Sequence, residues 1–155
     1  MPTVDSTNSY VTEAEAATYF GERLYADNWT SATEANRQKA LLMACKLLDG
    51  HVVWEGVKAD EDQDLEWPRA GVADYEDDEI PPLVQEAQME LALVLLATDT
   101  TALPGDQGVA EEKLGPMETV YDKTDRLQVI PDRIMSMLAG LGRLKGLASS
   151  VTRTR

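Results

Sequence analysis

The segment Pro81–Thr98 holds the densest run of apolar residues in the chain, and its pattern changes along its length. Polar residues alternate with apolar ones in its first half, whereas all seven residues of Leu91–Ala97 are apolar. The two prolines at its start suit the first turn of a helix, where no intrahelical N–H bond is needed. A helix that is apolar all round must be buried all round, and seven such residues are too few to cross a bilayer. The pattern therefore predicts a central core helix and no membrane span.

Two more helices are predicted before this segment. Each follows a Thr/Ser-x-x-Glu capping box, in which a hydroxyl and a carboxylate satisfy N–H groups at the start of a helix. The first helix is predicted over about Thr12–Tyr25, and the second over about Ala32–Leu48, with Ser31 as its capping residue. Gly50 is expected to end the second helix. The residues around Trp29 are expected to form the turn between the two helices.

Three further segments complete the predicted fold. His51–Glu79 contains too many apolar and aromatic residues for a disordered tract, so we expect an ordered loop. Val109–Tyr121 alternates around a Gly-Pro pair and predicts a short β-hairpin, and Asp132–Leu138 predicts a last helix. The expected fold is mainly α, a small bundle of about four helices with a long ordered loop and a short β-hairpin. Residues 1–137 would form this domain, and residues 138–155 would form a flexible C-terminal arm.

Length and charge narrow the classes of function. The chain has 155 residues, 43% of them hydrophobic, and a formal net charge of -14, which fits one acidic globular domain. Such a charge repels phosphate and argues against a protein that coats DNA or membranes. The charge is uneven, because residues 60–79 contain ten acids and one arginine, whereas the five charged residues after Asp132 are all basic. The chain thus combines an acidic middle with a basic C-terminal end.

Patterns for catalysis or metal binding are sparse. The single cysteine and the single histidine cannot complete a usual zinc site or an internal disulfide. Asp60, Asp62 and Asp64 have the spacing of the start of an EF-hand loop, but Leu65 occupies the position of its required glycine. No glycine-rich phosphate loop with its lysine is present. We therefore expect no metal, no cofactor and no enzymatic activity, and a hydrolase that uses the acidic residues ranks last.

Four aromatic residues could either contact a binding partner or pack in the core. Trp29, Trp54, Trp67 and Tyr75 could stack the bases of single-stranded nucleic acid. Proteins of that kind usually surround such aromatics with lysine and arginine, whereas the neighbours here are mostly acidic. This composition favours a role in fastening the loop to the helices.

The predicted C-terminal arm combines leucines at every third position with basic residues and no acid. Apolar, basic and flexible ends often become ordered on a partner, although an ordinary frayed terminus can have the same composition. The candidate docking residues of the arm are Leu138, Leu141, Arg143, Leu144, Lys145, Leu147, Arg153 and Arg155.

Several short motifs occur in the order found in a known protein family. They are Asn8-Ser9-Tyr10-Val11, Trp29, Leu65-Glu66-Trp67-Pro68-Arg69, Ile80-Pro81-Pro82, and Gly115-Pro116 followed by Val120-Tyr121. With them, the chain resembles the head–tail connector, or adaptor, proteins of tailed bacteriophages over roughly Asn8–Leu138. Related sequences are often labelled DnaT-like single-stranded-DNA-binding proteins. The most specific motif is Leu65-Glu66-Trp67-Pro68-Arg69.

The resemblance implies a structural protein of the virion neck that is made in the cytoplasm of the bacterial host. Its subunits would form a ring, commonly a dodecamer, below the portal protein, with the arm docked on the portal. The ring would extend the DNA channel, receive tail, stopper or tail-terminator proteins, and let duplex DNA pass without specific binding. An acidic channel wall would repel phosphate, and its candidates are Asp60, Glu61, Asp62, Asp64, Asp77, Asp78 and Glu79.

The alternative function is that of a DnaT-like replication accessory protein. Such a protein would bind single-stranded DNA through the four aromatic residues and the basic C-terminal end.

Overall fold

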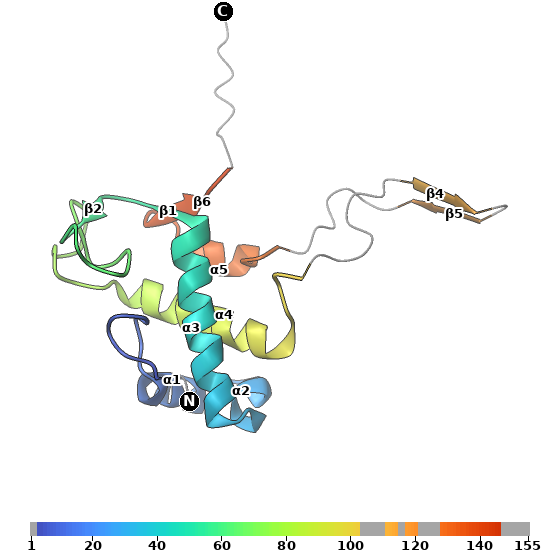
Figure 1. The fold of residues 1–155 in the computed structure, drawn as a ribbon, viewed down its shortest axis with the longest axis horizontal. Coiled ribbons are helices and arrows are strands. Elements are labelled where there is room, and N and C mark those ends of the chain that lie inside the picture. The colour runs from blue at the N-terminus through green and yellow to red at the C-terminus, as the bar shows by residue number, and fades with distance from the viewer. Residues whose placement is uncertain (1–2, 103–110, 115–116, 121–127, 147–155) are drawn as a thin grey trace, which may run out of the picture.

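The structure, a computed structural model, describes the backbone of residues 3–102, 111–114, 117–120 and 128–146, and the side chains of residues 3–102 and 128–146. Its helices are α1 (Glu13–Gly21), α2 (Asp27–Ser31), α3 (Glu34–His51), α4 (Pro82–Ala97) and α5 (Asp132–Met137). Its strands are β1 (Val52–Trp54), β2 (Val57–Lys58), β3 (Arg69–Ala70), β4 (Glu111–Leu114), β5 (Met117–Val120) and β6 (Gly142–Leu144). The expected mainly α fold with a small β-hairpin is confirmed. At the centre of this fold, α3 crosses the middle of α4 (Figure 1).

The first predicted helix begins as its capping box requires. Thr12 Oγ1 accepts a hydrogen bond from Glu15 N at 3.2 Å, and the Glu15 carboxylate accepts one from Thr12 N at 2.7 Å. The helix ends at Gly21, earlier than predicted. Tyr25, the predicted end, has a φ of 59°, which a right-handed helix cannot contain.

The segment between the first and second predicted helices differs from the prediction. The residues around Trp29 form a short helix, α2, rather than a plain turn. The N-cap of α3 is Thr33 and not Ser31, and Thr33 Oγ1 accepts a hydrogen bond from Asn36 N at 3.3 Å. The prediction that Gly50 ends this helix is also wrong, because α3 continues to His51 and leads directly into β1.

The central helix α4 is confirmed, but its fully buried segment lies earlier in the chain than the predicted Leu91–Ala97. Residues 87–93 are all buried, including the polar Gln88 and Glu90, whereas Val94, Leu95 and Leu96 are only half-buried. The middle of α4 is covered because it crosses α3, while its last turns extend past that crossing (Figure 1). The predicted all-round burial is therefore wrong for the second half of the apolar run.

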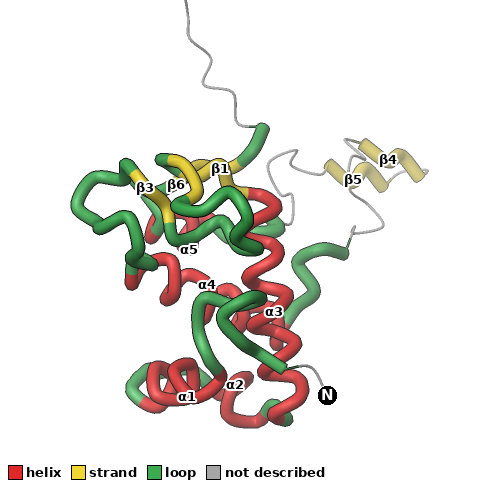
Figure 2. The backbone as a smooth tube through the Cα atoms, turned by 60° about the vertical axis from the view of Figure 1, so that its left-hand side comes forward, coloured by secondary structure: helices red, strands yellow, loops and turns green. Residues whose placement is uncertain are grey.

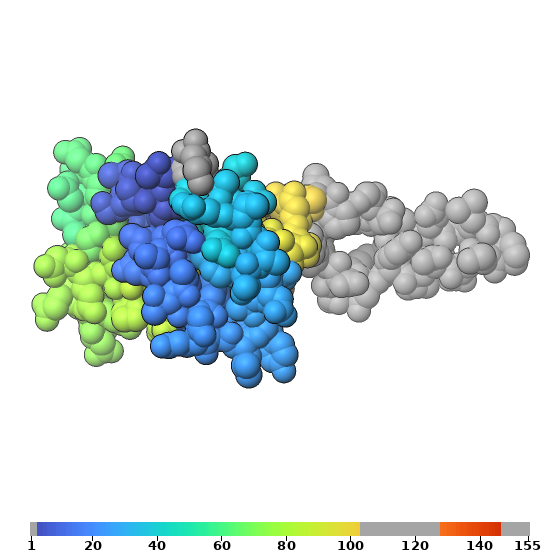
Figure 3. Space-filling view, turned by 90° about the horizontal axis from the view of Figure 1, so that it is seen from below, coloured from blue at the N-terminus to red at the C-terminus, as the bar shows by residue number. Residues whose placement is uncertain are grey.

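The buried apolar residues of the core come from two parts of the chain, Tyr10–Leu93 and Ile130–Leu141. Seen from below, α1 and α2 cover the lower end of the bundle (Figure 3). Burying one large apolar side chain stabilises the folded state by roughly 1.5–3 kcal/mol, so the burial of the core side chains dominates the stability of the fold. The largest fully buried apolar side chains include Leu41, Leu48, Trp67, Leu91, Ile130, Ile134 and Leu138.

A two-stranded sheet of β1 and β6 places the last described residues beside the C-terminal end of α3. β6 pairs antiparallel with β1, so that Gly142 lies opposite Trp54. Leu138 and Leu141, which the prediction placed in the arm, are buried in the core. The predicted boundary at residue 138 is therefore wrong, because these leucines pack and the following strand pairs. Leu147, Arg153 and Arg155 lie outside the described residues.

The predicted β-hairpin is confirmed, with β4 and β5 paired antiparallel. Figures 1 and 2 both show these strands apart from the helices. The long loop is ordered as predicted, and β2 and β3 pair within it. Within the described ranges, none of the helices combines the length and the apolar character that a bilayer span requires.

Candidate functional site

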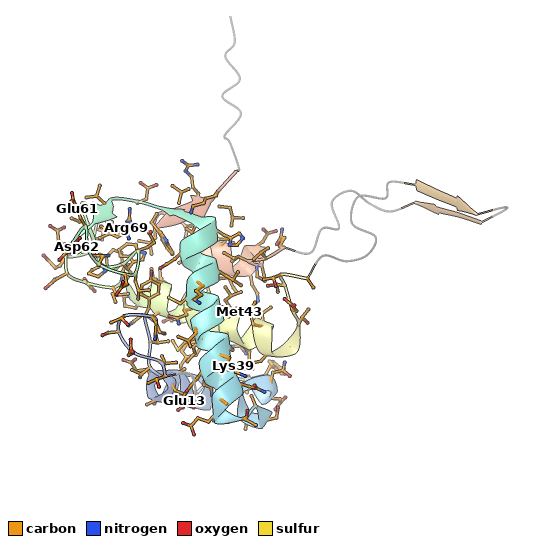
Figure 4. All side chains as sticks on the ribbon, in the orientation of Figure 1. Glu13, Lys39, Met43, Glu61, Asp62 and Arg69 are labelled. Carbon is orange, nitrogen blue, oxygen red and sulfur yellow. The ribbon has the colours of Figure 1, made fainter. Side chains whose placement is uncertain are left out.

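The predicted acidic residues lie in two segments of the long loop, residues 60–64 between β2 and β3 and residues 77–79 between β3 and α4. Figure 4 shows Glu61 and Asp62 at the outer side of this loop. Among the described residues, no group of histidine, cysteine and carboxylate side chains could hold a metal ion. All seven candidates are exposed, and their orientation toward a channel stays a prediction; they are Asp60, Glu61, Asp62, Asp64, Asp77, Asp78 and Glu79.

The three tryptophans belong to the core and not to a surface. Trp29, Trp54 and Trp67 are 3%, 6% and 1% exposed, and Tyr75 is half-buried. Trp67 packs edge-on against Trp54, with ring centroids 5.7 Å apart. The role in fastening the loop is confirmed for Trp54 and Trp67, whereas Trp29 packs against Phe20 in the helical part of the core. The hypothesis that these tryptophans stack bases is wrong, because a base cannot reach their faces.

The motif Leu65-Glu66-Trp67-Pro68-Arg69 folds the long loop onto itself. The buried Arg69 guanidinium donates to the Glu55 and Gly56 carbonyl oxygens at 2.7 and 2.8 Å, and to the Glu66 carboxylate at 2.8 Å. The Gln63 side-chain amide donates to the carbonyl oxygens of Leu65 and Pro68 at 2.8 and 3.0 Å. The motif that carries most of the family resemblance therefore has a structural role within the subunit.

Asp49 on α3 joins two motifs that are far apart in the sequence. Its carboxylate accepts hydrogen bonds from the Tyr10 hydroxyl and, at 3.1 Å, from Glu66 N. Burial raises the pKa of Asp49, although these hydrogen bonds oppose that effect. Burial also raises the pKa of the neighbouring Cys45 thiol to about 12, whereas a reactive cysteine needs a lowered pKa. This cluster holds the fold together and offers no nucleophile.

A second polar cluster, centred on Glu90, was not predicted. Its carboxylate accepts hydrogen bonds from the Tyr19 hydroxyl, from Nε and Nη2 of Arg23, and from Nη1 of Arg133. Burial alone would raise the pKa of Glu90, but these hydrogen bonds hold that pKa below its usual range. The cluster fastens the end of α1 and the start of α5 to the middle of α4.

The exposed face of α3 is basic in an otherwise acidic protein. Lys39, Met43 and Lys46 are exposed, and their spacing of four and three residues places them on one side of the helix, opposite its buried face. Figure 4 shows Lys39 and Met43 on this side of α3. Residues 35–48 contain no acid. The lysines of this face therefore have no acidic neighbour within residues 35–48 of the helix, whose acids Glu34 and Asp49 lie nearer its two ends.

The basic face continues at the C-terminal end of α3. Lys145 N donates a hydrogen bond to the His51 carbonyl oxygen at 2.8 Å, which fixes the end of β6 against the end of the helix. Both Arg143 and Lys145 are exposed. We call the exposed residues Lys39, Met43, Lys46, Arg143 and Lys145 the basic strip. The sequence indicated the two β6 members in the predicted arm, but the lysines of α3 were missed, although helical spacing could have grouped them.

An anion can contact the basic strip despite the net charge of -14, because salt screens the repulsion from distant acidic residues. At physiological ionic strength the Debye length is about 8 Å, so an anion in contact with the strip is largely screened from distant exposed acids.

Comparison with known proteins adds one finding. No curated protein and no solved structure matches the chain. A family model does match it, over residues 2–155, and that model is described as a putative DnaT-like ssDNA binding protein. Since the match covers almost the whole chain, the protein belongs to the family that this model describes, the putative DnaT-like ssDNA binding proteins.

Proposed function

We propose that the protein binds single-stranded DNA and that the basic strip is its contact surface. The observation that carries this proposal is the exposed pair Lys39 and Lys46 on α3, together with the exposed Arg143 and Lys145 of the segment that is hydrogen-bonded to the end of that helix. The description of the matching family supports the same activity. No chemical step is involved, so the proposed role is that of a binding protein and not of an enzyme.

The physical basis of this binding is the release of counterions. Each phosphate that a lysine or arginine neutralises releases counterions from the strand, which gives affinity without dependence on base sequence. Lys39 and Lys46 are seven residues apart, and therefore lie about 10 Å apart along the helix axis. The flexible, polarizable Met43 between them offers an apolar contact. Arg153 and Arg155, outside the described residues, would add to the same charge.

A matched pair of variants tests the contact surface. Lys46→Ala and Lys58→Ala each remove one positive charge, but Lys58 lies outside the strip and pairs with Glu66 at 3.7 Å. We expect Lys46→Ala alone to weaken binding to an oligo(dT) strand, measured by fluorescence anisotropy. Its log–log salt dependence should be shallower by about 0.7, the value for one lost phosphate contact. Equal salt slopes for the two variants would show that the strip is not the contact surface.

A head–tail connector is the second candidate function. The exposed acidic loop and the hairpin apart from the helices favour it, together with the resemblance of the sequence motifs. In this role the subunits would form a ring on the portal protein, accept tail or stopper proteins in the virion neck, and line the DNA channel. Electron microscopy of the protein mixed with its portal tests this candidate. A ring seated on the portal is expected, and absence of any complex would reject it.

A further inference from the structure

The turn between α1 and α2 presents two large apolar side chains to solvent. Leu24 is 77% exposed and Tyr25 is 88% exposed. Among the described residues, Tyr25 is the one aromatic side chain that is exposed. Its φ of 59° lies in the left-handed region, which bulky residues rarely adopt. The backbone is thus held in an unfavourable conformation that turns an aromatic ring outward.

Arg23 holds this turn in place. Its Nη1 donates to the Leu24 carbonyl oxygen at 2.6 Å and to the Tyr25 carbonyl oxygen at 3.2 Å. Its other two nitrogens donate to the buried Glu90 carboxylate. The guanidinium therefore connects the exposed turn to the middle of α4, so the position of the Tyr25 backbone is fixed before any partner arrives.

Charged groups of both signs surround the turn, with the exposed carboxylates of Glu22 and Asp27 on either side of it in the sequence. Arg133 also donates to Glu90, so two guanidinium groups share one carboxylate. The Arg133 side chain is 51% exposed and can meet an anion from solvent.

The turn is also connected to the helix that carries the basic strip. Arg37 on α3, two residues before Lys39, donates to the Trp29 carbonyl oxygen at 2.8 Å and thereby fixes α2.

An exposed aromatic ring in the same cluster as a half-exposed arginine offers a stacking face for a nucleic-acid base and a cation for its phosphate. Bases stack on aromatic side chains in single-stranded-DNA-binding proteins, and such contacts tolerate any base. We infer that Tyr25 stacks an unpaired base of single-stranded DNA, with Leu24 extending the apolar surface and Arg133 facing the neighbouring phosphate. This inference rests on the proposed function and adds a second contact, distinct from the basic strip.

Two strands of equal length test the inference, oligo(dT) and an abasic oligonucleotide with the same phosphates. The full-length wild type should bind oligo(dT) more tightly than the abasic strand. Tyr25→Asn removes the ring while keeping a residue that tolerates a positive φ. It should weaken oligo(dT) binding by about 5- to 150-fold, the range that loss of one stacked base gives. Abasic binding should not change, and Tyr25→Phe should bind both strands as the wild type does.

The outcomes separate this inference from the function on which it rests. If the wild type binds neither strand, the proposed function itself fails. If it binds both strands equally, or if Tyr25→Asn binds oligo(dT) as the wild type does, the stacking contact is refuted while DNA binding stands. Sedimentation velocity of the same proteins gives one more outcome. Loss of self-association in Tyr25→Asn with unchanged DNA binding would assign the turn to a protein contact and overturn the inference.

Discussion

Replacing Glu90 with glutamine tests the most highly connected buried group of the fold. Glu90→Gln keeps the size of the side chain but removes its charge. The glutamine amide nitrogen is a donor and cannot accept the arginine N–H groups that one carboxylate oxygen now accepts. The substitution therefore leaves part of the guanidinium donors of Arg23 and Arg133 without their partner.

The structure sets the size of the expected effect. The Glu90 side chain is 5% exposed and accepts three hydrogen bonds from arginine nitrogens, and such charge-assisted bonds contribute about 1.5–3 kcal/mol each. Arg23 and Arg133 are 27% and 51% exposed, so water can replace part of what is lost. We expect the free energy of unfolding to fall by about 2–4 kcal/mol in total. That is a large part of the 5–15 kcal/mol typical of a domain.

Urea denaturation followed by circular dichroism measures this loss. With an m-value of about 2 kcal/mol/M, the middle of the typical range, the midpoint should fall by about 1–2 M. Glu86→Gln is the matched control, because Glu86 lies one turn earlier on α4 and forms no ion pair within the described part of the chain. The free energy of unfolding of Glu86→Gln should stay within about 0.5 kcal/mol of the wild-type value, as for most substitutions away from buried networks.

The pH dependence of stability provides a second readout of the same group. Because the folded-state pKa of Glu90 is lowered, its contribution is fully present above the unfolded-state pKa, about 4.3. The contribution is lost as the pH falls through the lower folded-state value. Glu90→Gln should therefore destabilise the protein at pH 7, and the difference from the wild type should shrink as the pH falls below the unfolded-state pKa and through the folded-state one. Equal stability of Glu90→Gln and wild type at pH 7 would refute the importance assigned to the cluster.

Three further predictions concern the core and the end of the chain. Leu91→Asp should unfold the protein, since it buries an unpaired charge. Leu95 is only half-buried, so Leu95→Asp should be less destabilising. Thermal melts of both variants check this. Gly142→Ala should cost about 1–3 kcal/mol in urea denaturation, because the new Cβ would lie 2.5 Å from Val52 Cγ1, whereas Gly50→Ala, with no atom within 4 Å, should not destabilise. Removing residues 147–155 should leave the circular-dichroism spectrum and the melting temperature unchanged, and a lower melting temperature would contradict this.

Local signals in the sequence predicted much of the fold. The capping box at Thr12, the two prolines before α4 and the alternating hairpin each act within a few residues, and each element forms where expected. The predictions that were wrong depend on distant partners. Leucines at every third position could equally have marked an exposed docking surface, and only the pairing of β6 with β1 shows that Leu138 and Leu141 belong to the core.

The candidate site was harder to predict, because its groups come together only in the fold. Glu90 is separated by 67 residues from Arg23 and by 43 from Arg133, so nothing in its local sequence indicates a buried ion cluster. Trp54 and Trp67 were correctly expected to fasten the loop. Tyr25 was not singled out, because neither its exposure nor its positive φ can be read from neighbouring residues.

A salt-dependent titration of the wild type with single-stranded DNA tests the central claim most directly. Fluorescence anisotropy of a labelled oligo(dT) strand would be measured at about 50 and 200 mM salt. If the four cations of the basic strip each neutralise one phosphate, the slope of log K against log salt is about -2.8, a loss of roughly 50-fold between the two conditions. Binding at low salt that weakens to this extent would support single-stranded-DNA binding through the strip. Absence of binding at 50 mM salt would contradict it and leave the head–tail connector as the function to test.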